Sequence, residues 1–280
     1  MTKNISFLLS LLLLFGGLNM EAKKSKSVNL RFGTYNIRGE HINDKGTINE
    51  WSVRKDNFCK DMLEQNFDIV GMQEVKANQL EYIREQTGYS VVGSRGLFDP
   101  IFYKSDRFEL LRCETFWLSE SMEPFSKGWD GKYDRYCTWA EFRERSSGVN
   151  FFVFNTHLDH RGELARQEGA ALICREAARI AAGSPIFICG DMNSRDDSAA
   201  YASFAGHYLD ARKIAAEVSG PVGTFNGFGK YLPPKDKDKI DYIFVNDRIA
   251  VKSYRVAVTR LSNGSCPSDH CPVIIEAKIK

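Results

Sequence analysis

Two polar side chains, Asp191 and Asn193, follow directly on an apolar run and are separated by a single residue. The run, residues 186–189, has the length and composition of a fully buried strand. Gly190 would let the chain turn sharply as it leaves the core. Open α/β sheets bind their ligands at such strand ends, although an Asx turn that merely closes the strand would show the same pattern.

Polar residues stand at the ends of several other apolar segments of the chain. They are Asn36, Glu74, Asn155, His157, Asp241, Asp269 and His270. If the strands lie side by side, carboxylates, amides and two His converge on one cleft, as metal-assisted hydrolysis requires. Oxygen ligands without thiolates favour a hard ion, Mg²⁺ or its substitute Mn²⁺, which pairs naturally with phosphate. A His-activated water would then attack phosphorus in line.

The run Ser268-Asp269-His270 contains the residue types of a serine hydrolase. Contiguous residues of an extended chain alternate between faces, so these three side chains cannot form one hydrogen-bonded triad. The sequence also lacks a G-x-S-x-G nucleophile elbow. It therefore argues against this class.

The length and charge of the chain limit its class. With 280 residues it forms one large domain or two tightly packed ones, and its net charge of +2 argues against a protein that coats nucleic acid. Residues 5–18 form an apolar run behind Lys3, too short for a membrane span of about 20 residues. We therefore expect a signal peptide over residues 1–22, an exported protein in the periplasm or medium, and one domain over residues 23–280.

The seven cysteines are irregularly spaced, and their odd number leaves at least one without an intramolecular partner. We expect no disulfide scaffold, and we expect Cys174 and Cys189 to pack as small hydrophobic residues. The first of the seven is Cys59, so no cysteine near residue 22 could carry a lipid anchor.

The hydrophobic pattern predicts strands interleaved with a few helices. We expect strands near residues 29–36, 68–72, 89–93, 99–104, 107–112, 136–145, 149–155, 186–189, 240–246, 251–259 and 272–279. We expect helices near residues 49–66, 79–87, 164–182, 198–204 and 209–217. In the first helix Val53, Phe58, Met62 and Leu63 should face inward. This order favours two packed sheets with helices outside.

Six segments together resemble the endonuclease/exonuclease/phosphatase superfamily, which includes pancreatic-type deoxyribonuclease, bacterial sphingomyelinases, inositol polyphosphate 5-phosphatases and nocturnin-like deadenylases. They occur in the family's order over nearly the whole chain after residue 22. They are Thr34-Tyr35-Asn36-Ile37-Arg38, Gln73-Glu74, Asn155-Thr156-His157-Leu158-Asp159, Gly190-Asp191-Met192-Asn193, Lys239-Ile240-Asp241-Tyr242-Ile243 and Ser268-Asp269-His270.

This resemblance implies an α/β four-layer sandwich, with two mixed β-sheets packed face to face and the cleft at one edge of both. It also implies that Glu74 is the principal Mg²⁺ ligand, with Asn36 and Asp269 nearby. For any one of these residues, capping of a strand end is the structural alternative.

The same resemblance implies the catalytic roles. His270 would be the general base on the water, or the residue that holds the phosphate, with Asp241 orienting it. Asp191 and Asn193 would position the nucleophile and the phosphoryl oxygens, and His157 would stabilise the developing charge.

Three further residues are candidates for substrate binding. Arg135 could hold a phosphate, although an Arg in a strand is more often in a surface ion pair. Trp129 could stack on a base or sugar, and a packed Trp is the alternative. Asn155 could contact substrate or cap its strand.

The substrate follows less directly from the sequence. Residues 94–99 form a shorter loop than relatives carry at this point, so no relative's substrate can be transferred. Loops 120–135 and 220–239 interleave aromatic and cationic residues, yet duplex DNA would call for a more basic face. We therefore expect a monomer without a membrane anchor that acts on a small or single-stranded phosphoester. The alternatives are a duplex-DNA endonuclease and a catalytically silent binding protein on the same fold.

Overall fold

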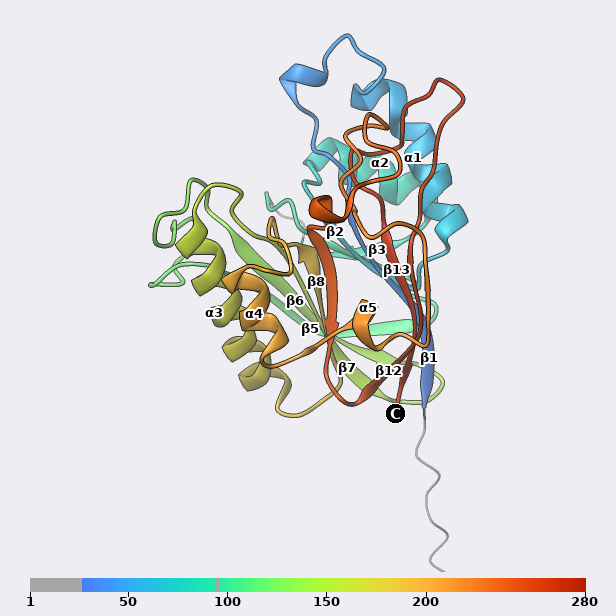
Figure 1. Cartoon of the computed structure of the whole chain (residues 1–280). Coiled ribbons are helices and arrows are strands. Elements are labelled where there is room, and N and C mark those ends of the chain that lie inside the picture. The colour runs from blue at the N-terminus through green and yellow to red at the C-terminus, as the bar shows by residue number, and fades with distance from the viewer. Residues whose placement is uncertain (1–26, 94–95) are drawn as a thin grey trace, which may run out of the picture.

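The computed structural model describes residues 27–93 and 96–280, which form two mixed sheets packed against each other (Figure 1). The predicted signal peptide, residues 1–22, lies outside the described residues. In spatial order the seven-stranded sheet contains β10 (Glu217–Ser219), β12 (Ile249–Val256), β13 (Val273–Ile279), β1 (Val28–Asn36), β2 (Ile69–Gln73), β4 (Ile101–Tyr103) and β3 (Ser90–Val92). The six-stranded sheet contains β5 (Phe108–Trp117), β6 (Tyr136–Glu144), β7 (Asn150–His157), β8 (Ile186–Asp191), β11 (Asp241–Val245) and β9 (Leu209–Asp210).

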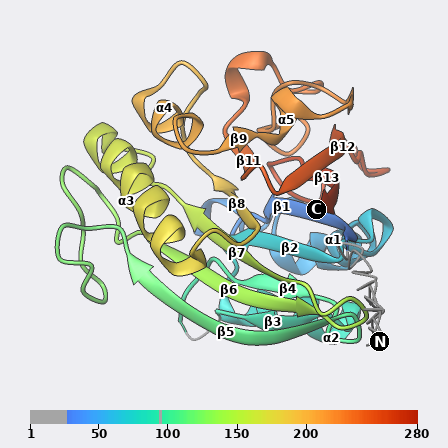
Figure 2. The ribbon, with the colours of Figure 1, turned by 90° about the horizontal axis from the view of Figure 1, so that it is seen from below.

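Helices form the two outer layers of the molecule. Helices α1 (Trp51–Gln65) and α2 (Ala77–Thr87) pack on the seven-stranded sheet through one apolar cluster. Helices α3 (Glu163–Ala181) and α4 (Ala199–Ala205) cover the six-stranded sheet through another, as the view from below shows (Figure 2). The predicted four-layer α/β sandwich is confirmed. None of the described helices has the length and apolar character needed to cross a membrane.

The core between the sheets is largely aromatic and β-branched. Phe32 of β1 stacks on Phe187 of β8 with ring centroids 4.6 Å apart, so the two sheets meet through this pair. Phe151 of β7 packs edge-on against Phe187 at 5.9 Å. Such aromatic pairs contribute about 0.5–1.5 kcal/mol beyond the area that they bury.

The inward face of α1 differs from the prediction. Phe58 and Met62 are buried as expected, but Val53 is 51% exposed and Leu63 is 47% exposed. The helix instead buries Trp51 and the side chain of Arg54, three residues later, because these positions share the stripe of Phe58 and Met62. The positions of apolar residues alone therefore did not identify the face of α1 that packs on the sheet.

Two predicted elements have the wrong type or length. The helix expected over residues 209–217 is only the short α5 (Ala211–Ile214), with β9 before it and β10 after it. Asp210 caps its start by accepting a hydrogen bond from the Arg212 backbone N–H at 2.9 Å, and the chain then joins β12. The strand expected over residues 107–112 continues to Trp117, because its whole length pairs with β6.

Asn155 joins the two sheets and does not reach the cleft. Its Nδ2 donates to the carbonyl oxygens of Met72 at 2.8 Å and Pro100 at 3.0 Å, and its Oδ1 accepts from Gln73 Nε2 at 2.7 Å. A Cβ on Gly71 would lie 2.6 Å from Asn155 Oδ1, so the glycine makes this approach possible. The predicted role of Asn155 in substrate binding is wrong, since the side chain is fully buried and its polar atoms are already bonded.

Replacing Asn155 with Ala should therefore lower stability. The substitution leaves buried polar groups of Gln73, Met72 and Pro100 without partners, and we expect the free energy of unfolding to fall by roughly 2–3 kcal/mol. Asn150→Ala, at the more exposed start of the same strand, is the control and should cost under about 1 kcal/mol. Urea unfolding of both variants measures the difference; equal stabilities would show that Asn155 does not join the sheets.

Candidate active site

The strand registers bring the predicted site residues to one edge of both sheets. Parallel pairing of β1 with β2 sets Asn36 beside Gln73, and parallel pairing of β7 with β8 sets His157 beside Asp191. Strand β11 runs antiparallel to β8 and begins with Asp241 directly opposite Asp191. The carboxyl ends of four strands and the start of a fifth therefore share one edge.

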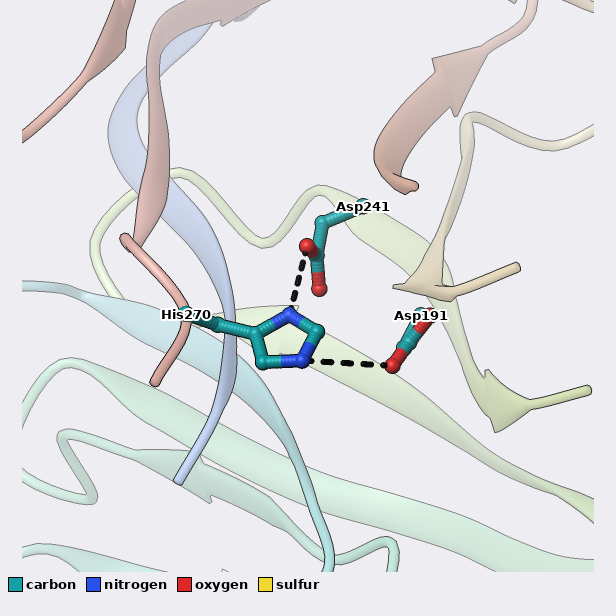
Figure 3. Close-up of side chains that lie close together, drawn as sticks. All are labelled: Asp191, Asp241 and His270. Atoms are coloured by element: carbon teal, nitrogen blue, oxygen red, sulfur yellow. Dashed lines mark hydrogen bonds and ion pairs between the residues drawn. The ribbon is translucent and has the colours of Figure 1, made fainter. Parts of the chain in front are cut away.

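His270 lies between two buried carboxylates at this edge (Figure 3). Its Nδ1 is 2.8 Å from Asp241 Oδ2, and its Nε2 is 3.8 Å from Asp191 Oδ2. A proton on Nδ1 is thereby held by Asp241, and Nε2 is directed toward Asp191 and the cavity. This orientation suits an imidazole that exchanges a proton through Nε2.

The protein shifts the pKa values of the two site histidines in opposite directions. Burial opposes a charge on His270, but Asp241, Asp191 and Asp269 outweigh it and raise its pKa above the usual range. Burial and the Arg135 charge hold the pKa of His157 well below its usual range. Pairs of titratable groups pushed apart in this way are typical of sites that transfer protons.

Glu74 is held in place by hydrogen bonds to both carboxylate oxygens. Oε1 accepts from Asn36 Nδ2 at 3.1 Å, and Oε2 accepts from the Gly39 backbone N–H at 3.0 Å. Burial opposes ionisation of Glu74, but these bonds outweigh burial and lower its pKa. Its backbone has a left-handed φ of 65°, an uncommon conformation for a non-glycine residue that often accompanies functional sites.

Asn36 links Glu74 to Asp191. Its Nδ2 also donates to Asp191 Oδ2 at 3.0 Å, while its Oδ1 accepts from the Arg38 backbone N–H at 3.0 Å. The buried amide therefore fixes two carboxylates at once, and its oxygen keeps one lone pair for a further ligand.

A cavity of about 780 Å³ opens onto these groups. Of the predicted residues, those lining it are Glu74, Arg135, His157, Asp191, Asn193, Asp269 and His270. Asn36 and Asp241 are buried behind this wall. Asn193 has a φ of 45° and donates from Nδ2 to the Leu158 carbonyl oxygen at 2.9 Å, which fixes its position at the end of β8.

The sequence profile of the Endonuclease/Exonuclease/phosphatase family matches residues 33–270 of this chain. The chain belongs to this family. The predicted family is thereby confirmed.

Solved structures of the family are similar over nearly the whole chain. A Bacteroides vulgatus family protein is 35% identical with a TM-score of 0.84, covering 90% of this chain and 100% of that one. A mannosyl-6-phosphatase from Bacteroides thetaiotaomicron VPI-5482 is 31% identical with a TM-score of 0.82, covering 89% and 99%. Among curated proteins, Nocturnin from Drosophila melanogaster is 25% identical over 82% of this chain. This chain spans only 42% of that protein's length.

The carboxylates of this family member fit a hard divalent cation. Glu74, Asp191 and Asp269 line this one cavity, and burial of the side chains raises the pKa values of Asp191 and Asp269 because their charges are not fully compensated. Asp191, Asp241 and His270 form the tightest group of potential ligand atoms among the described residues, within 4.8 Å. His270 Nδ1 is already bonded to Asp241, however, so a hydrogen-bonded chain explains that group better. The oxygens of Glu74 and Asp269 are the better cation ligands.

Of the candidates for substrate binding, Arg135 lies in the cavity wall and Trp129 does not. Arg135 lines the cavity, and its Nε is buried without a hydrogen-bond partner in the described part of the chain. Trp129 does not line it: the ring packs against the apolar cluster beneath α3, and its backbone N–H donates to Glu120 at 3.2 Å. The packing alternative named for Trp129 is therefore the arrangement that the structure shows, and stacking of its ring on substrate stays a prediction.

Sequence analysis missed Arg38 as a residue of the cavity wall. Its Nε donates to Asp44 Oδ2 at 2.9 Å, and its Nη1 lies 3.9 Å from Asp269 Oδ2. The residue stands in the first family segment, but its left-handed φ of 59° turns it into the cavity, and no residue pattern encodes that.

A second group that the sequence analysis missed positions Asp241 and His270. Thr224 Oγ1 accepts hydrogen bonds from the backbone N–H groups of Ile240 and Asp241, each at 3.1 Å. The next residue, Phe225, forms an isolated β-bridge with His270. Residues 224–225 thus hold Asp241 and His270 relative to each other.

Buried Arg54 fixes the loops on the other side of His270. Its guanidinium donates to the carbonyl oxygens of Pro267 at 2.9 Å and Asn49 at 3.0 Å, and also to that of Arg38. Burial lowers its pKa to about 10, and no carboxylate lies within ion-pair distance of it in the described structure. The side chain therefore holds together, by hydrogen bonds, the backbone segments that carry site residues.

Thr224→Val should reduce turnover because it removes the acceptor of two buried N–H groups next to Asp241. We expect kcat to fall by about tenfold or more, which corresponds to an activation free energy raised by roughly 1.4 kcal/mol or more because Asp241 is misplaced. Thr224→Ser keeps the hydroxyl and is the matched control, with kcat within about threefold of wild type. Equal turnover of the Val and Ser variants would show that this hydroxyl does not position Asp241.

Proposed function

We propose that this protein is a Mg²⁺-dependent phosphoesterase in which His270 activates the attacking water. The observation that carries the proposal is the buried Asp241–His270 pair, whose free Nε2 is directed at Asp191 inside a cavity that contains Glu74. The mannosyl-6-phosphatase and Nocturnin among the similar proteins support a hydrolase. Retention of all these site residues also argues against a catalytically silent copy.

In this mechanism His270 Nε2 takes a proton from the water while Asp241 stabilises the resulting imidazolium. Asp191 and Asn193 orient the water and the phosphoryl group, and His157 donates a hydrogen bond to the oxygens where charge develops. Arg38 and Arg135 hold the remaining phosphate oxygens. When bound at Glu74, Asp269 and Asn36, Mg²⁺ would polarise a phosphoryl oxygen and favour the neutral form of His270 by its charge.

Removal of divalent ions should abolish activity. Dialysis against a chelator is expected to lower the rate of phosphoester hydrolysis by at least about 100-fold, since the metal supplies several kcal/mol of charge stabilisation. Added Mg²⁺ or Mn²⁺ should restore it, and Ca²⁺ is the comparison ion. Full activity after exhaustive chelation would overturn the metal part of the proposal.

We further propose that the substrate is a small or single-stranded phosphoester. The cavity is bordered by cations and by the Tyr133 ring, which stacks on His160 with centroids 5.1 Å apart. With a net charge of only +2, the protein does not have the strongly basic character that many contacts to duplex DNA require.

A substrate panel at matched salt tests this proposal. Sugar phosphates, a short single-stranded oligonucleotide, sphingomyelin and duplex DNA should be compared by kcat/KM in the presence of Mg²⁺. We expect a sugar phosphate or the oligonucleotide to exceed duplex DNA by about tenfold or more, because the many phosphate contacts that duplex binding needs are lacking. Duplex DNA as the best substrate would contradict the proposal and leave the metal mechanism standing.

Export remains a proposal that rests on residues 1–22 alone. If the segment is a signal peptide, the protein should be found outside the cytoplasm without it. Intact-mass measurement of protein recovered from the periplasm or medium tests this directly. A mass that includes residues 1–18 is the contrary result.

A further inference from the structure

A side pocket of about 190 Å³ adjoins the catalytic cavity. Glu74, Arg135 and His157 line both spaces, so a molecule with its phosphate in the cavity can extend into the pocket. The pocket's own wall includes Phe98 and Asp99, which lie just before β4. None of the catalytic steps proposed above uses these two residues.

Asp99 is a buried carboxylate with few partners. The residue is 2% exposed, and its Oδ1 accepts one long hydrogen bond, from the Glu74 backbone N–H at 3.4 Å. No Lys, Arg or His nitrogen lies within 4 Å of it in the described part of the chain. Arg135 Nε, on the same wall, is also buried and without a partner. Buried polar groups are nearly always hydrogen-bonded, so a carboxylate with one long hydrogen bond and a guanidinium nitrogen with none, on the wall of one pocket, indicate that a ligand completes their hydrogen bonds.

The segment that carries Asp99 is held firmly in place. The Val75 backbone N–H donates to the Phe98 carbonyl oxygen at 2.7 Å, and the Met72 N–H donates to the Pro100 carbonyl oxygen at 2.9 Å. The Phe98 N–H donates to the hydroxyl oxygen of Tyr136. These bonds fix the backbone on both sides of Asp99. A side chain that binds a ligand selectively requires such a fixed backbone.

The charges of the pocket select against a second phosphate. Asp99, Asp134 and Glu40 line it beside Glu74, against the cations Lys76 and Arg135. Hydroxyl groups of a ligand can form hydrogen bonds with both kinds of side chain in this wall, because each hydroxyl can donate to a carboxylate and accept from a guanidinium. Phe98 is 47% exposed and presents an apolar surface for the carbon face of a ring.

We propose that this pocket binds the polyhydroxylated part of the substrate, so that the enzyme acts on a sugar phosphate monoester and Asp99 accepts hydrogen bonds from its hydroxyls. The inference rests on the proposed phosphoesterase function. It adds that the alcohol esterified to the phosphate is a sugar.

The test compares substrates that share the phosphate but differ in hydroxyls. Wild-type protein with Mg²⁺ is assayed on mannose 6-phosphate, on adenosine 5′-monophosphate and on methyl phosphate, which lacks hydroxyls. We expect the hexose phosphate to be preferred over methyl phosphate by at least tenfold in kcat/KM. Asp99→Asn should reduce that preference at least fivefold, because Asn can still accept from the Glu74 N–H but replaces the second carboxylate oxygen with a donor.

The controls separate this inference from the proposed function. Asp106→Asn, an exposed Asp outside the pocket, should leave the preference unchanged. Thermal unfolding and inhibition by free mannose are measured for each protein, and mannose should inhibit the Asp99→Asn variant more weakly than wild type. If wild type cleaves the single-stranded oligonucleotide but none of the three monoesters, the pocket proposal alone is overturned; if it hydrolyses neither the monoesters nor the oligonucleotide, the phosphoesterase proposal fails. If it hydrolyses the monoesters without preference for the hexose phosphate, or if Asp99→Asn lowers all rates by one factor, the pocket proposal alone is overturned.

Discussion

The hydrogen bond between Asp241 and His270 is the constraint on which the site depends. It joins a residue at the start of β11 to a residue just before β13, so strands of different sheets must meet at one edge to form it. Two buried hydrogen-bonded groups are costly to separate, because each would be left without a partner in a medium that solvates it poorly. Packing of the sheets and formation of the site are therefore coupled.

The surrounding structure supports this bond with buried polar groups rather than with more apolar contacts. Thr224, Arg54 and Asn36 each bind two or more backbone or carboxylate atoms of site segments. Buried polar groups that lose a partner cost about 1–3 kcal/mol each, whereas apolar packing tolerates small shifts. Such a network can hold proton-transfer partners at fixed distances. Apolar packing alone would leave those distances more variable.

Much of the site could be predicted from sequence because strand ends converge in a sandwich of this kind. Seven of the predicted residues line the cavity, and Asn36 and Asp241 lie directly behind it. Asn155 and Trp129 show the limit of that argument: Asn155 lies within β7 and faces the opposite sheet, and Trp129 lies in the loop between β5 and β6 and packs beneath α3. Arg38 and Arg54 could not be found, because a left-handed backbone and a buried guanidinium arise only from tertiary contacts.

The most direct test of the account is the turnover of a His270→Ala variant that is shown to be folded by its thermal unfolding. With Mg²⁺ present, kcat on the best substrate of wild type should fall by about 100-fold or more, the range that general base catalysis supplies. KM should change much less, because Arg38, Arg135 and the cation site remain. A folded His270→Ala protein with wild-type kcat would contradict the proposed mechanism.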